Sequence, residues 1–112
     1  RLLSRGLGDV YKRQDSSRAR GLMGIDYLGE NEGMIFFWPS ASKKCMWMKN
    51  TNLPLSVAFI DQDRTIVQIN YLQPLSTESV CSRSERIIAA IEMNKDWFEE
   101  NGLKEGSQVI LN

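Results

Sequence analysis

The segment 43–61 holds the residue types that could do chemistry. A tryptophan lies between two methionines, directly after Cys45 and directly before the run Lys49–Thr51. Lysine, asparagine and threonine side chains donate hydrogen bonds, so this run could hold an anionic or carbonyl-bearing ligand at a strand end. Trp47 would supply an apolar wall beside it.

Glu92 is a second chemical feature, because it interrupts an otherwise apolar strand pattern. A buried carboxylate needs a partner, so we expect Glu92 to face the same site or to pair with Lys49. Arg20 could contribute in the same way. The candidate ligand-binding residues are therefore Trp47, Lys49, Asn50, Thr51, Glu92 and Arg20.

Core packing explains most of the same residues without a ligand. Side chains alternate along a strand at 45–48, so the cysteine and tryptophan would lie on one side and the methionines on the other. Both sets would be core, since aromatic and methionine residues at strand spacing are more often core than site. The run 49–52 would then be a turn whose side chains bond the backbone.

Two further chemistries stay open. Glu92 or Lys49 could act as acid or base in a small enzyme, but the chain has no histidine, so catalysis would rest on a Lys/Glu couple. Met46 and Met48 could bind Cu(I) through their thioethers, although Trp47 would then point away. We expect a non-catalytic domain with no cofactor.

The composition is that of one globular domain. The 112 residues are 42% hydrophobic and 25% charged. No apolar run reaches the roughly 20 residues that cross a bilayer. The formal net charge is zero and the lysines are scattered, which argues against nucleic-acid binding.

Residues 1–14 differ from the rest of the chain. They carry four basic residues against one acidic residue, a net charge of +3, and have no apolar periodicity. Asp9–Gln14 resembles the translated end of a transposon adapter used in sequencing libraries. We interpret 1–14 as non-native and 15–112 as a single domain; a natural basic tail or the end of a signal segment is the alternative.

The pattern of the remaining residues predicts an α+β domain, with a small antiparallel sheet or barrel-like sheet and two short helices. The apolar run 33–38 predicts a strand buried on both faces that ends at Pro39. The helices are expected at 15–23 and at 95–101, the second capped by Asn94. Further strands are expected at 45–48, 55–61, 65–72, 86–93 and 107–111.

Cys45 and Cys81 lie 36 positions apart and form no C-x-x-C motif. They are either two unrelated buried thiols or one disulfide that pins the 73–86 loop to the strand at 45–48. The residues alone leave both possibilities open. A disulfide would imply an oxidising compartment.

Several motifs resemble those of domain-of-unknown-function family 192, a small α+β domain. Trp-Met-Lys-Asn-Thr followed by Pro-Leu is the most specific of them, and the match runs from about Arg18 to the C-terminus. The motifs are Arg-Gly-Leu-Met at 20–23, Gly-Met-Ile-Phe at 33–36, Trp-Met-Lys-Asn-Thr at 47–51, Pro-Leu at 54–55 and Gly-Leu-Lys-Glu-Gly at 102–106.

The resemblance, closest to the proteobacterial branch, implies an exported periplasmic monomer with Cys45 bonded to Cys81; a cytoplasmic protein is the alternative. Its partner would be an unidentified small ligand or an envelope protein. Family members begin with a strand that this sequence lacks, so we expect one unpaired sheet edge. The chain departs from the family pattern at Gly24, at Ser56 in place of aspartate, and at Arg64 in place of a hairpin glycine.

Overall fold

The computed structural model describes residues 2–4 and 21–111 of the chain. Most of its elements are antiparallel strands, and a single short helix is found in this part of the chain. The elements are β1 (Leu2–Ser4), β2 (Glu32–Ser42), β3 (Cys45–Met46), β4 (Leu55–Asp61), β5 (Ile66–Leu72), β6 (Val80–Cys81), β7 (Ile87–Asn94) and α2 (Trp97–Glu100). The main sheet has five strands in the order β1-β2-β7-β4-β5, and β3 pairs with β6 in a second sheet.

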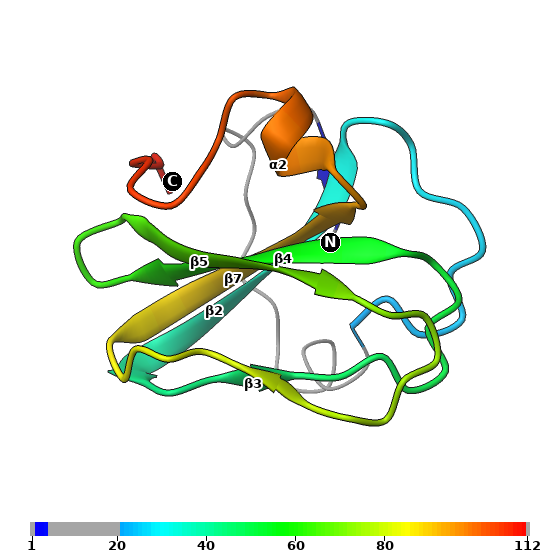
Figure 1. Cartoon of the computed structure of the whole chain (residues 1–112), viewed down its shortest axis with the longest axis horizontal. Coiled ribbons are helices and arrows are strands. Elements are labelled where there is room, and N and C mark those ends of the chain that lie inside the picture. Colours follow the sequence, from blue (N-terminus) through cyan, green and yellow to red (C-terminus); the bar gives the residue numbers. More distant parts are fainter. Residues whose placement is uncertain (1, 5–20, 112) are drawn as a thin grey trace.

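Both faces of the main sheet are covered, as Figure 1 shows. On one face, β3, β6 and the segment 21–28 enclose a core that includes Met34 and Val57. On the other face, α2 and the C-terminal segment enclose a core that includes Ile35 and Ala58. We call these the β3 face and the α2 face. Neighbouring residues of one strand therefore enter different cores.

Burial on two faces explains the continuous apolar runs of the central strands. The first six residues of β4 are all buried, and β4 pairs with both β5 and β7. At the start of β2 the backbones come very close, because a Cβ at Gly33 would collide with the Met93 sulfur and the Glu92 carbonyl oxygen. Glycine is therefore required where β2 lies against β7.

The fold is less helical than the sequence pattern predicted. The expected helix at 15–23 falls largely outside the described residues, and 21–24 form a turn. Asn94 does not cap α2: it ends β7, and its side-chain amide donates to the carbonyls of Leu28 and Gly29 at 3.1 Å each. The domain is thus a small β-rich fold, and the strands of its described residues form an open sheet rather than a closed barrel.

Strand boundaries differ from the prediction where irregular backbone intervenes. β2 continues through Pro39 to Ser42, because the β2–β7 register breaks between Phe37 and Ser42 and a proline is tolerated at such an irregularity. The strand expected at 107–111 is wrong: in that segment only Gln108 makes a bridge, to Thr65. A turn at 105–106 leads directly into that segment, and 109–111 have no regular structure.

The expected unpaired sheet edge is also wrong. Leu2–Ser4 pair with residues 32–34 of β2 in antiparallel register. The β2 edge is therefore covered over three residues, by part of the segment 1–14 that the sequence suggested is non-native.

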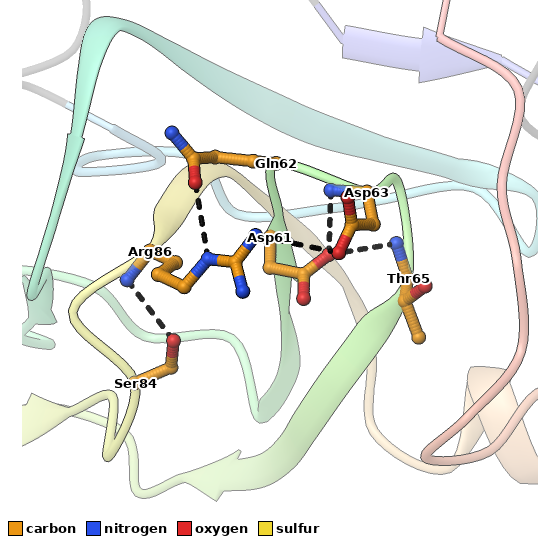
Figure 2. Close-up of polar contacts among 6 residues, drawn as sticks. All are labelled: Asp61, Gln62, Asp63, Thr65, Ser84 and Arg86. Carbon is orange, nitrogen blue, oxygen red and sulfur yellow. Dashed lines mark hydrogen bonds and ion pairs between the residues drawn. The ribbon is translucent and has the colours of Figure 1, made fainter.

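The hairpin between β4 and β5 is held by side chains as well as by its backbone, as Figure 2 shows. The Asp61 carboxylate accepts from the backbone N–H groups of Asp63 at 2.9 Å and Thr65 at 3.2 Å. The guanidinium of Arg86, just before β7, donates to the Gln62 side chain at 3.0 Å and lies 3.4 Å from the Asp63 carboxylate. These contacts tie the turn to the start of the central strand.

Arg64 occupies this hairpin with φ of 62°, where a side chain is unfavourable. We expect Arg64→Gly to raise the free energy of unfolding by about 1 kcal/mol, because glycine adopts this conformation at no steric cost. The exposed bond from Arg64 to the Leu111 carbonyl contributes little against this gain. Arg64→Ala removes the same bond without relieving the backbone, so thermal denaturation of the two variants separates the effects; equal melting temperatures would contradict the prediction.

Candidate functional site

A pocket of about 280 Å³ opens on the β3 face of the sheet. Its walls come from the turn at 21–24, from β2, and from the chain through β3 to residue 51, and β7 contributes one carboxyl group. The lining residues are Gly21, Leu22, Met23, Phe36, Trp38, Cys45, Met46, Trp47, Met48, Thr51 and Glu92.

Glu92 is set into this pocket by the register of the central strand. It lies opposite Met34 on β2 and Val57 on β4, which both belong to the core of the β3 face. Only 4% of its surface is exposed, and within 21–111 its carboxyl group has no hydrogen-bond or ion-pair partner. Burial raises the pKa of Glu92 to about 8. At pH 7 the pocket therefore presents a neutral carboxylic acid.

The strand at 45–48 alternates as predicted, but one side of it is not core. Met46 and Met48 are buried, with 8% and 2% of their surfaces exposed. Trp47, by contrast, is 46% exposed, so its ring forms an outer wall of the pocket. The regular strand ends at Met46, and the Met48 N–H donates instead to the Ser76 carbonyl at 3.0 Å.

The run 49–52 forms a tight turn, and backbone geometry explains part of its specificity. Asn50 has φ of 55°, a conformation that asparagine tolerates better than most residues. The Asn50 carbonyl accepts from the Gly24 N–H at 3.1 Å. Thr51 is buried, and its hydroxyl donates to the Lys49 carbonyl at 3.2 Å. The turn therefore holds the 21–24 wall of the pocket against β3.

The six candidate binding residues do not all meet. Trp47, Thr51 and Glu92 line the pocket, whereas Lys49 and Asn50 are exposed and do not line it. The Lys49 ammonium lies over the Trp47 ring, 5.3 Å from its centre, and no ion pair joins it to Glu92. Arg20 lies outside the described residues.

Other lining residues were not among the sequence candidates. Met23 joins the two predicted methionines, so three thioethers line one pocket. Phe36 and Trp38 stack with their ring centres 6.1 Å apart and add a second aromatic wall. The Arg-Gly-Leu-Met motif drew attention to Met23, but no spacing rule in the sequence connects Met23 to Glu92 on β7.

The disulfide between Cys45 and Cys81 is confirmed. The two cysteines face each other across β3 and β6, with an S–S distance of 2.12 Å and no free cysteine in the described residues. Cys45 also lines the pocket. Next to the bridge, the Ser82 hydroxyl accepts from the Lys44 N–H at 3.0 Å. The disulfide therefore fixes the outer wall of the pocket to the long 73–86 loop.

Comparison with known proteins places the chain in a family. Domain-of-unknown-function family 192, described as an uncharacterized ACR, matches residues 10–111. No curated protein matches the chain. No helix in the described segments is long and apolar enough to span a membrane.

Two solved structures are similar over nearly the whole chain. One is a protein from Sinorhizobium meliloti 1021 described as a candidate transcription regulator; it is 31% identical, the match covers 98% of this chain and 89% of that chain, and the TM-score is 0.83. The other is a protein of unknown function from Novosphingobium aromaticivorans DSM 12444, at 27% identity, 97% and 82% coverage and a TM-score of 0.83. With the family match across residues 10–111, these likenesses establish that the chain belongs to domain-of-unknown-function family 192.

Proposed function

We propose that this domain binds a small, largely apolar molecule in the pocket beneath Trp47 and does not transform it. One observation carries the proposal: a fully buried carboxyl group without a partner in 21–111 faces a pocket of ligand size. A buried polar group that no protein atom satisfies costs roughly 1–3 kcal/mol. A ligand that bonds Glu92 would recover that free energy on binding.

The chemistry of the lining supports binding over catalysis. A Lys49–Glu92 couple would be needed for acid–base work, and the two side chains are not paired. Three thioethers and three aromatic rings provide apolar contact rather than reactive groups. A single Cu(I) ion would leave most of a 280 Å³ pocket unfilled, so the methionines do not extend the proposal to copper.

A second pocket of about 630 Å³ lies between β5 and α2. It is larger, but its charged residues Asp96, Glu99, Lys104 and Glu105 are all exposed, and water satisfies them without a ligand. We therefore centre the function on the smaller pocket.

We propose a periplasmic location for the protein. The disulfide supports an oxidising compartment, because such bridges are rare in proteins of the cytosol.

The regulator description of the Sinorhizobium meliloti protein is not extended to this chain. Its 14 basic residues are balanced by 14 acidic ones, and Arg83 and Arg86 lie beside Glu105 and Asp63.

Trp47→Ala should weaken the binding of small apolar fragments at least fivefold, because it removes the outer wall without disturbing the core. Binding is measured by amide chemical-shift changes in NMR, which should map to 21–24, to 45–51 and to Glu92. Tyr71→Ala is the matched control, since Tyr71 is also 46% exposed and does not line this pocket. If no fragment in a library changed the amide chemical shifts of these segments, the proposed function would be contradicted.

A further inference from the structure

Only one residue that lines the pocket can become charged, and its charge is negative. Among its lining residues Glu92 is the sole titratable side chain, and no lysine or arginine lines it in the described chain. A site for an anion would instead present guanidinium or ammonium donors. The electrostatic character of the lining therefore favours a ligand that brings positive charge to the carboxyl group.

The aromatic walls point to the same kind of ligand. The face of a tryptophan ring attracts ammonium groups, and methylated ammonium ligands are held in cages of such rings. Two of the three pocket rings already attract ammonium groups of this chain. The Lys44 Nζ lies 4.8 Å from the centre of Trp38, and the Lys49 Nζ lies 5.3 Å from the centre of Trp47.

Volume limits the size of the ligand. At about 280 Å³ the pocket lies just below the usual range of ligand sites, roughly 300 to 1,000 Å³. A bare metal ion would leave it mostly empty, and a lipid chain or an oligosaccharide would not fit inside it. A compact organic ion of few carbon atoms matches this space.

We propose that the ligand is a small organic cation of the trimethylammonium type, whose charge is neutralised by the Glu92 carboxylate within walls of aromatic rings and thioethers. This inference rests on the proposed ligand-binding function. The cation replaces the partner that Glu92 lacks within 21–111.

Binding of the cation must then be coupled to the release of a proton from Glu92. Without ligand Glu92 is neutral at pH 7, because burial raises its pKa to about 8, and an adjacent cation favours the ionised form. Among the described residues, the groups packed around it do not titrate: Met34 on β2, Val57 on β4, and the lining residues of 21–24 and 45–51. In the same part of the chain, Lys44 and Lys49 are the charged side chains that reach the pocket's rings. The cation therefore displaces the carboxyl proton into solvent.

The test uses choline as the probe, in calorimetric titrations at pH 6, 7 and 9. Affinity should rise about tenfold from pH 6 to pH 7 and about tenfold again to pH 9, following the ionised fraction of Glu92. At pH 7 about one proton should be released per choline bound, measured in buffers of different ionisation enthalpy. The neutral carbon analogue, in which tert-butyl replaces trimethylammonium, should bind more weakly at pH 9 and show no such trend.

Glu92→Gln keeps the shape of the side chain and removes its charge. It should lower choline affinity at pH 9 at least tenfold and leave binding of the carbon analogue unchanged; Glu100→Gln on α2 is the exposed control. Choline affinity that is independent of pH, or an analogue that binds as well as choline at pH 9, would overturn the cation assignment while leaving the pocket a binding site. Absence of binding by both probes and by every fragment would overturn the proposed function itself.

Discussion

Glu92→Gln is expected to raise the free energy of unfolding at pH 9 by about 5 kcal/mol relative to the unsubstituted protein. The pKa of Glu92 is raised from 4.5 to about 8 by burial, a difference of roughly 3.5 units at about 1.4 kcal/mol each. Glutamine occupies the same buried position without ever ionising. The large effect reflects one uncompensated carboxyl group in the middle of the central strand.

The sign follows from proton linkage. Between pH 4.5 and pH 8 the folded protein holds a proton on Glu92 that the unfolded chain has released. The free energy of unfolding therefore falls across this window as the pH rises, and levels off above the folded pKa. Below pH 4.5 both states are protonated, so the protein and its variant should have nearly equal stability there.

Urea denaturation at pH 4 and at pH 9 measures the effect, and the difference between the two proteins cancels the titration of all other groups. Glu100→Gln, at an exposed position of α2, should leave the pH profile unchanged. Parallel profiles for the protein and Glu92→Gln would contradict a neutral, unpartnered carboxyl group. A variant less stable at pH 9 would show that a cation within the chain already pairs with Glu92.

Removal of the disulfide is expected to produce the second largest loss of stability. Cys45 and Cys81 close a loop with a sequence separation of 36, and the chain-entropy model assigns such a cross-link about 4 kcal/mol. Most of the cost is the freedom that the unfolded chain regains. The local effect is on the two-residue strands β3 and β6, which have few other pairing partners.

The double variant Cys45→Ser/Cys81→Ser should therefore unfold at a lower urea concentration than the oxidised protein. Reduced unsubstituted protein should behave like the double variant, and reducing agent should not affect the double variant. Fluorescence adds a local readout, because Trp38 and Trp47 line the pocket while Trp97 packs on the α2 face. An unchanged urea midpoint would contradict the assigned role of the bridge.

Much of the sheet could be predicted because its central strands obey a simple rule. The runs at 55–61 and 86–93 are almost entirely apolar, and short runs of this kind rich in β-branched residues are typical of strands covered on both faces. Their observed bounds, Leu55–Asp61 and Ile87–Asn94, lie within one residue of the prediction. The second helix was expected at 95–101, and α2 (Trp97–Glu100) lies inside that range, followed by Gly102 with φ of 72°.

Elements whose limits depend on contacts distant in sequence were predicted less well. Pro39 did not end β2, since an irregular register accommodates it. Asn94 was expected to cap a helix, but its amide instead bonds the loop at Leu28 and Gly29, 66 and 65 positions earlier. Contacts between residues so far apart in the chain produce no periodic pattern that sequence analysis could detect.

The residues of the candidate site also fall into those that the sequence predicted and those that only the tertiary structure identified. The sequence by itself determined the family, the two cysteines, and the presence of an isolated carboxyl group in an apolar strand, because these depend on residue identity and local spacing. Only the tertiary structure decided that Glu92 enters the same pocket as Trp47 and Met23, and that Lys49 does not. The reason is register: β7 lies between β2 and β4 so that Glu92 emerges between Met34 and Val57 on the β3 face, whereas the turn at Asn50 directs Lys49 onto the exposed tryptophan ring.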